Sequence, residues 1–300
     1  MGSRANYFLV RDGTRSTLTS PRGAAGLAFD MFWGPERAIP FVERLAKARG
    51  ENLLDAAGGA VVDIDNHVLL LFGGGVQSDV PLRRMYLELA QATWFGWEVR
   101  WSMTGQLGLA DYLGLPHNPF LAADAVQVDS EEKRADPLKR RKRRGAVNTM
   151  VSVRLRHGEL RLYPIWLPSK QAPMPIAGLV AAATDRPAPG RIDWTDWTRR
   201  FPAGGLHLDA GMQHGVWWAA DTHRPIFDRS GSPEWTIETF DDRFEAQLVE
   251  TGDCLRFPER SQADLVAQLR GILGVRRLDP LHGQEKRTFA AALEALRQAQ

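Results

Sequence analysis

Three side chains that could bind a divalent metal lie close together after an apolar run. Asp63, Asp65 and His67 occupy alternate positions, and alternate side chains of an extended backbone point to one face. Two carboxylates and an imidazole are suitable ligands for a divalent cation. A hairpin turn is the alternative, because Asp and Asn hydrogen-bond to nearby backbone groups and tolerate left-handed conformations. We predict a turn without a metal, and these three residues are the candidates if a metal does bind.

A glycine-rich segment forms a candidate anion site. Gly73, Gly74 and Gly75 follow an apolar run, and Ser78 precedes a predicted helix. Backbone N–H groups and the helix dipole can hold an anion at such a place. The segment matches neither the Walker motif nor the dinucleotide-binding motif, and Asp79 would repel a phosphate. A flexible connection between strand and helix is therefore the preferred interpretation.

No catalytic residue can be assigned from the sequence. Cys254 is the one cysteine, and three histidines, His207, His214 and His223, precede it. A cysteine–histidine pair is conceivable, but cysteine is also among the most commonly buried residues. No Gly-x-Ser-x-Gly motif marks a serine nucleophile. We expect a structural cysteine, and the sequence assigns no cofactor.

A run of six basic residues could contact an acidic partner. It consists of Lys139, Arg140, Arg141, Lys142, Arg143 and Arg144. Each cation could neutralise a nucleic-acid phosphate, but no aromatic residues are interleaved for base stacking. The segment 129–144 holds eight basic and four acidic residues, which leaves 30 basic and 32 acidic residues elsewhere. The rest of the chain is therefore slightly acidic, and a solvated linker is the alternative.

Tryptophan is abundant, with ten residues in the chain. Trp97 and Trp101 alternate with charged residues, which predicts a half-buried strand with both indoles on one face. Trp217 and Trp218 are adjacent, so in a strand they point to opposite faces. Tryptophan is enriched at protein interfaces, and these four residues are the candidates for a partner surface. The alternative is that most tryptophans lie in the core.

Hydrophobic patterning predicts hairpins and helices in segregated runs. Strands are expected at 7–10, 16–20, 60–64, 68–72, 97–101, 151–155, 159–167, 206–210, 216–219, 234–239 and 243–250. Helices are expected at 35–50, 80–93, 193–201, 261–273 and 284–298. Runs of strands with segregated helices favour an α+β fold with mainly antiparallel sheets.

The same layout occurs twice along the chain. The segment 58–63 matches 204–209 at an offset of 146, and 6–13 matches 151–158 at 145. The segment 96–99 matches 234–237 at an offset of 138. We therefore predict two tandem, diverged α+β repeats. The first spans 1–125, a basic linker spans 126–148, and the second spans 149–300 with the C-terminal helices.

The composition is typical of a soluble globular protein. Of 300 residues, 44% are hydrophobic and 25% are charged, which excludes disordered and fibrous chains. No apolar run approaches the roughly 18 residues of a membrane span. A single cysteine permits no internal disulfide and is typical of a reducing compartment. We expect a cytoplasmic protein.

Three functions are consistent with these observations. The first is a binding or accessory protein that presents a tryptophan-lined surface, or a groove between the units, to a macromolecular partner. A toxin-neutralising or assembly factor would be an example. The second is a hydrolase or transferase with its site at the interface of the two units, where paired domains leave a cleft. The third is nucleic-acid binding through the basic run.

Overall fold

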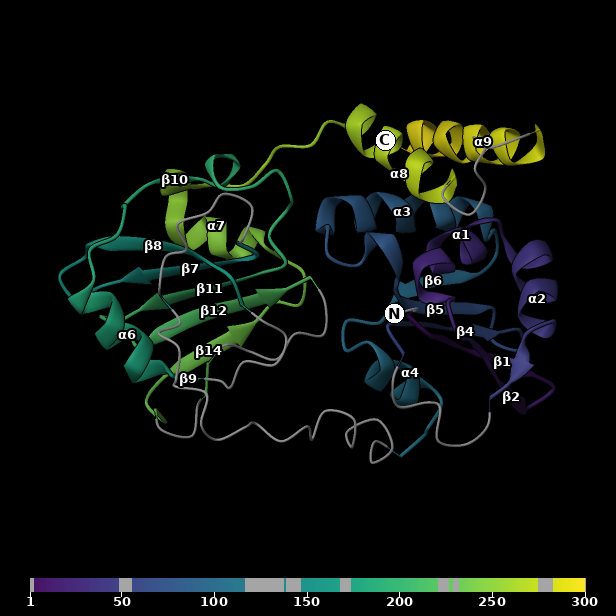
Figure 1. The fold of residues 1–300 in the computed structure, drawn as a ribbon, viewed down its shortest axis with the longest axis horizontal. Helices are drawn as coiled ribbons and strands as arrows, with labels where there is room; N and C mark the ends of the chain where they lie inside the picture. Colours follow the sequence, from purple (N-terminus) through teal and green to yellow (C-terminus); the bar gives the residue numbers. More distant parts are fainter. Residues whose placement is uncertain are drawn as a thin grey trace. The chain divides into compact units, whose positions relative to one another are not determined.

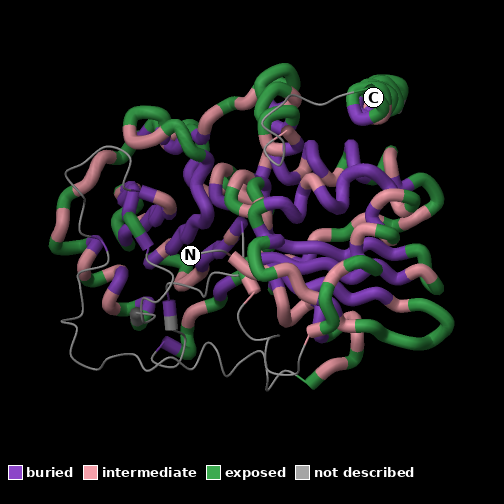
Figure 2. Tube along the Cα trace, turned by 45° about the vertical axis from the view of Figure 1, so that its right-hand side comes forward, coloured by how far each residue is buried: buried purple, intermediate pink, exposed green. Residues whose placement is uncertain are grey.

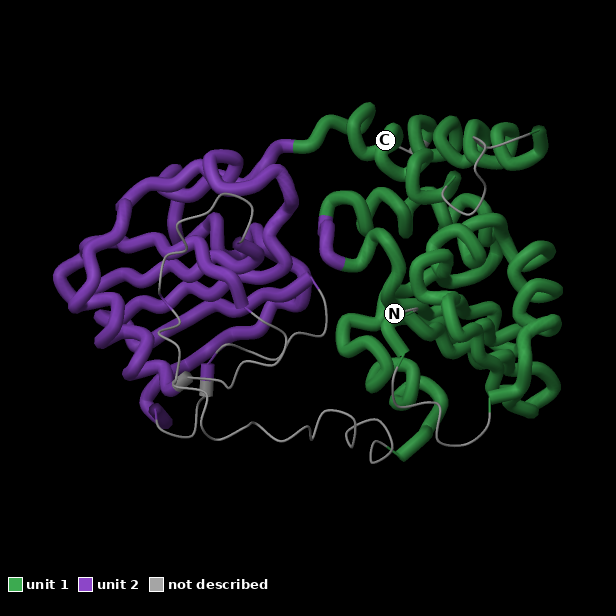
Figure 3. Tube along the Cα trace, in the orientation of Figure 1, with its two compact units in different colours: residues 1–77, 81–126, 260–300 green, residues 78–80, 127–259 purple. Residues whose placement is uncertain are grey.

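The chain forms two compact units, each with one main β-sheet (Figures 1 and 3). The computed structural model describes residues 3–48, 56–116, 138, 147–167, 174–220, 227–228, 232–274 and 283–299. Unit 1 comprises 1–77, 81–126 and 260–300, and unit 2 comprises 78–80 and 127–259. Helices and mixed sheets occur in both units, so the predicted α+β class is confirmed. The sheets are mixed rather than mainly antiparallel, because the hairpins pair with each other and with the last strand in parallel.

The sheet of unit 1 is built from two hairpins and two flanking strands. In chain order its strands are β1 (Ala5–Arg11), β2 (Thr14–Ser20), β3 (Ala46–Lys47), β4 (Gly58–Asp63), β5 (Val68–Gly73) and β6 (Glu98–Trp101). Their order in the sheet is β3-β2-β1-β4-β5-β6. The hairpins β1–β2 and β4–β5 are antiparallel, whereas β1 pairs with β4 and β5 with β6 in parallel. Both predicted hairpins of this unit are confirmed.

Helices cover both faces of this sheet. They are η1 (Ala24–Gly26), α1 (Leu27–Phe32), α2 (Pro35–Glu43), η3 (Gly74–Val76), α3 (Val80–Thr93), α4 (Gln106–Tyr112), α8 (Gln262–Gly274) and α9 (Gly283–Ala299). Figure 1 shows α1 and α3 over one face, with α8 and α9 stacked above them, and α4 on the opposite side. The bounds predicted for 80–93 are confirmed. The helix predicted from 35 to 50 ends at Glu43 because the chain continues into β3.

The two C-terminal helices belong to unit 1, which corrects the expected second unit of 149–300. Arg260–Gln300 group with the first sheet. Leu265, Leu269 and Leu273 of α8 and Phe289 of α9 are buried in the same core as α1 and α3. Their apolar faces have the predicted helical spacing, but spacing does not indicate which sheet a helix covers. The outer surface of α9 is exposed (Figure 2).

The sheet of unit 2 has five strands. They are β7 (Thr149–Arg154), β8 (Leu160–Ile165), β11 (Gly204–Asp209), β12 (His214–Ala219) and β14 (Thr236–Thr239), in the order β14-β12-β11-β7-β8. Two small parallel pairs accompany it, β9 (Met174–Pro175) with β13 (Phe227–Asp228) and β10 (Ile192–Asp193) with β15 (Leu255–Arg256). The helical elements are α6 (Ile176–Asp185), η4 (Trp194–Asp196), α7 (Glu245–Thr251) and η5 (Gly252–Cys254).

Two predicted elements of unit 2 are wrong in type or length. The helix expected at 193–201 is the short 3-10 turn η4, although Asp193 does cap it, accepting a 2.9 Å hydrogen bond from the Thr195 N–H. The strand expected at 243–250 is the helix α7. Its buried positions, Gln247 and Thr251, are four residues apart and polar, so an apolar pattern could not reveal them.

The two sheets share one topology. β1, β2, β4, β5 and β6 correspond in order and pairing sense to β7, β8, β11, β12 and β14. Gly58 lies between Ala5 and Gly73, and Gly204 lies between Thr149 and Ala219. These glycines therefore occupy equivalent places at the predicted offset of 146. The opening strands correspond at 144 rather than 145, because the β7–β8 connection is longer than the two-residue turn of β1–β2.

Candidate functional site

A pocket of about 410 Å³ lies at one edge of the second sheet. The C-terminal ends of β7 and β11 meet at this edge because the two strands are parallel, and β14 begins there. Its apolar lining is Leu155, Ala177, Val180, Ala181, Ala210 and Trp235, and its polar lining is Arg156, His157, Thr184, Gln213 and Glu234. Four separate segments of the chain thus build one cavity.

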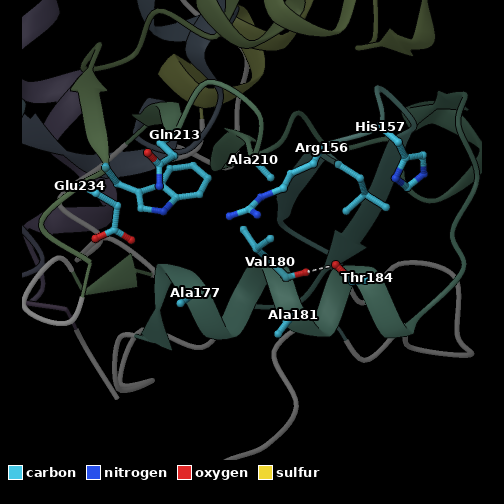
Figure 4. A pocket seen from close by; sticks show the side chains of 11 residues that line it. Arg156, His157, Ala177, Val180, Ala181, Thr184, Ala210, Gln213 and Glu234 are labelled. Carbon is cyan, nitrogen blue, oxygen red and sulfur yellow. Dashed lines mark hydrogen bonds between the residues drawn. The ribbon is translucent and has the colours of Figure 1, made fainter.

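Helix α6 forms the floor of this pocket. Ala177, Val180, Ala181 and Thr184 recur at intervals of three and four residues, so they share one helix face. A neighbouring face of the helix buries Ile176, Leu179 and Ala183 in the core of unit 2. The Thr184 hydroxyl donates to the carbonyl of Val180 at 2.9 Å (Figure 4). Two alanines on the pocket face leave room that larger side chains would fill.

Two opposite charges flank the pocket. In Figure 4, Arg156 extends over Val180, with His157 and Glu234 at opposite ends. Arg156 and Glu234 are both exposed. Within the described part of the chain, no hydrogen bond or ion pair engages the guanidinium of Arg156 or the carboxylate of Glu234. His157 differs, since its Nε2 lies 3.0 Å from Glu159 Oε2. Hydrogen bonds from Arg161 and then His157 lower the pKa of Glu159 to about 2.

The β11–β12 turn presents an apolar side chain next to the pocket. Asp209 Oδ1 accepts hydrogen bonds from the N–H groups of Gly211 and Met212, each at 2.9 Å. Gln213 then adopts a left-handed conformation with φ of 51°. Met212 is 76% exposed and lies in the chain between the lining residues Ala210 and Gln213. The turn therefore holds a flexible thioether in solvent near the mouth.

On the opposite face of this sheet, three buried polar side chains form a network. Gln247 of α7 donates to Ser152 Oγ at 3.0 Å and to the carbonyl of Leu206 at 3.1 Å. Its Oε1 accepts from the Trp218 indole N–H at 2.9 Å. Ser152 Oγ lies 3.0 Å from His207 Nδ1. The network connects α7 to three strands.

The serine–histidine pair in this network is inaccessible. Ser152 and His207 are both 0% exposed. Burial, reinforced by Arg154, lowers the pKa of His207 to about 4 despite the opposing effect of Asp209. His207 Nε2 has no hydrogen bond within the described residues and lies 3.9 Å from Glu250 Oε2. A substrate cannot reach a pair buried in this way, and we assign it a structural role.

The metal candidates form a hairpin turn. Asp63 accepts hydrogen bonds from the N–H of Asn66 at 3.0 Å and from the Tyr112 hydroxyl at 2.8 Å. Burial acts to raise the pKa of Asp63, but these hydrogen bonds outweigh it and lower the pKa. Asp65 binds the N–H groups of the β1–β2 turn, and His67 has a φ of 53°. Among the described residues, no group of three His, Cys, Asp or Glu could hold a metal.

The triple glycine has a packing explanation. Gly73 has a φ of 95°, and a Cβ there would lie 2.4 Å from Gly58 Cα. A Cβ on Gly75 would lie 3.3 Å from Ile272 of α8. Close approach of backbone and helix therefore accounts for glycine at these two positions. Gly74 begins the 3-10 turn η3, and Ser78 is exposed after it.

The tryptophan candidates are placed differently from one another. Trp217 and Trp218 point to opposite faces as predicted, but they are 4% and 0% exposed. Both belong to the core, which corrects their choice as surface residues. Trp97 and Trp101 are half-buried. Trp235 was not among the predicted surface residues, although it matches Trp97 at an offset of 138.

The basic run and Cys254 are the remaining residues that the sequence singles out. The basic run Lys139–Arg144 lies outside the described residues.

Cys254 is partly buried in η5, as a reduced cysteine. Among the helices that the structure describes, none is long and apolar enough to cross a lipid bilayer.

Comparison with known proteins gives no relative. No family model, no curated protein and no solved structure matches this chain.

Proposed function

We propose that this chain is a cytoplasmic binding or accessory protein whose second unit presents a tryptophan-lined pocket to a macromolecular partner. The pocket beside α6 carries this proposal, because it combines an apolar floor, the indole of Trp235 and two charged groups that no described residue engages. Trp, Met and Arg are the residue types that interfaces favour. Arg156, Met212 and Trp235 bring all three types to one edge of the sheet.

The chemistry of the pocket supports binding. Apolar area supplies affinity, whereas a few convergent polar groups fix the orientation of a ligand. Arg156, which extends over Val180, and Glu234 at one end of the pocket would select a partner with complementary charges. The buried Ser152–His207 pair is accounted for by packing of α7, so it supplies no accessible nucleophile.

Site-specific photocrosslinking tests this function. A benzophenone side chain replaces Met212 beside the pocket, and a control carries it at Val249, which is 79% exposed on α7. In extracts of the native host, position 212 should give a discrete protein adduct that position 249 does not give. The charge reversal Arg156→Glu should remove that adduct. Equal adducts at both positions, or none at 212, would reject the proposal.

A further inference from the structure

Trp97 in unit 1 and Trp235 in unit 2 occupy equivalent places but have different surroundings. In unit 1, the ring of Trp97 packs against Trp94, with centroids 4.9 Å apart, and against His67 at 5.3 Å. Both contacts are edge-to-face, with interplanar angles of 70°. Two aromatic rings therefore cover this indole.

Backbone hydrogen bonds establish that Trp235 is the counterpart of Trp97. The N–H of Trp97 donates to the carbonyl of Trp94 at 3.0 Å. In the same way, the N–H of Trp235 donates to the carbonyl of Ser232 at 3.1 Å. Likewise Glu98 N–H bonds to His67 O at 2.8 Å, and Thr236 N–H bonds to Gln213 O at 3.0 Å. The residue that follows each tryptophan thus makes the same bond to the preceding hairpin.

The rings that cover Trp97 are replaced in unit 2. Ser232 stands in place of Trp94, and Gln213 stands in place of His67 with nearly the same left-handed φ, 51° against 53°. No ring contact joins Trp235 to another described residue. Trp235 and Gln213 instead line the pocket. The second unit therefore has an unstacked indole at the place where the first unit stacks rings from its own chain.

We propose that this pocket binds the C-terminal aromatic residue of a partner protein, which rests on the proposed binding function. The aromatic ring packs against Trp235 over the small side chains of α6. The terminal carboxylate pairs with Arg156, and the amide N–H of the same residue lies toward Glu234.

The shape and charge of the site favour a chain end over an internal segment. A volume of about 410 Å³ is near the lower end of ligand pockets, about 300–1,000 Å³, which suits one residue. Arginine binds a carboxylate through two parallel hydrogen bonds, and a terminal residue carries its carboxylate next to its ring. Glu234 would repel a second acidic group but can accept from an N–H.

Titration of the full-length chain with short peptides tests the ligand class. The probe is acetyl-Gly-Gly-Phe with a free carboxylate, and the comparisons are its C-terminal amide, acetyl-Gly-Gly-Leu and free phenylalanine. Calorimetry gives the affinity of each peptide. The NMR signal of the Trp235 indole N–H, assigned by its absence in Trp235→Phe, shows by its shift whether a peptide binds in this pocket. The free acid should bind about tenfold or more tightly than the amide, since a charged hydrogen bond is lost. It should also bind more tightly than the leucine peptide.

Matched variants distinguish the pocket from the rest of the surface. Arg156→Gln should weaken the free acid about tenfold and leave the amide unchanged, whereas Arg200→Gln, at an exposed arginine outside the pocket, should change neither. Ala181→Trp should fill the pocket and abolish binding. Equal binding of acid and amide, equally tight binding of free phenylalanine, or no shift of Trp235 would overturn the inference. If position 212 still crosslinks to a partner in that case, the binding function stands and only the ligand class fails.

Discussion

At the scale of single residues, the second unit differs from the first by a buried polar network. The first unit has an apolar cluster on the same face of its sheet, which contains Phe8, Val61 and Leu109. The equivalent places in unit 2, by strand register and helix position, hold Ser152, His207 and Gln247. A buried network stabilises only when its members are satisfied. His207 is the member with an unpartnered nitrogen in the described structure.

His207 should make stability depend on pH in a defined window. Its pKa in the folded state is about 4, against 6.5 for the ordinary group, chiefly because of burial. Between these values the unfolded chain binds a proton that the folded protein does not. The free energy of unfolding should therefore fall as the pH is lowered from 6.5 to 4, by up to about 1.4 kcal/mol per pH unit. Above pH 6.5 this residue adds no pH dependence.

Urea unfolding at a series of pH values measures this effect. His207→Val, which introduces the residue of unit 1, should flatten the profile between pH 6.5 and 4. His67→Asn, at an exposed histidine without an ion pair in the described structure, should leave the profile unchanged, since Asn also tolerates the left-handed φ of this position. A wild-type slope that persists in His207→Val would show that other groups cause it.

At the scale of elements, helix α7 docks on the sheet with the side chain of Gln247 directly above a glycine. A Cβ on Gly205 would lie 1.9 Å from Gln247 Oε1 and 2.2 Å from Trp218 Nε1. The sequence predicted a strand at this helix because the residue that faces the sheet is a glutamine. Hairpins such as β4–β5 were predictable, since their apolar runs and turn residues are local. A helix that docks through a buried amide has no such local pattern.

Gly205→Ala should therefore destabilise unit 2. The added methyl group must displace Gln247 or Trp218, and overpacking of this kind costs about 1–3 kcal/mol. The matched change Gly271→Ala in α8, where a Cβ meets nothing within 4 Å, should instead stabilise by about 0.5–1 kcal/mol through helix propensity. Chemical denaturation gives both values. A neutral Gly205→Ala would show that α7 can shift without loss.

At the scale of the whole molecule, the repeated layout was predictable but the pocket was not. Glycine pairs and the Trp97–Trp235 match gave the correspondence of strands. The pocket combines segments near 155, 180, 211 and 235, and its small and polar residues form no motif. One difference between the two units in the sequence could have located the pocket: Ser232 stands where the first unit has Trp94. Comparison of the two sheets thus directs attention to this pocket through the aromatic rings that the second unit lacks.

The C-terminal helices α8 and α9 follow the second unit in the chain but complete the core of the first. Phe289 of α9 is 2% exposed and packs against Phe32, with ring centroids 5.8 Å apart. Phe289→Ala should cost about 3–5 kcal/mol, since it leaves a cavity between α9 and the layer below. Hydrogen exchange should then lose protection in β1, β4 and β5, while β7 and β11 keep theirs. Glu294→Ala, on the exposed side of the same helix, should alter neither sheet. Equal loss of protection in both sheets would show that the two units unfold as one, contrary to the separate cores on which this expectation depends.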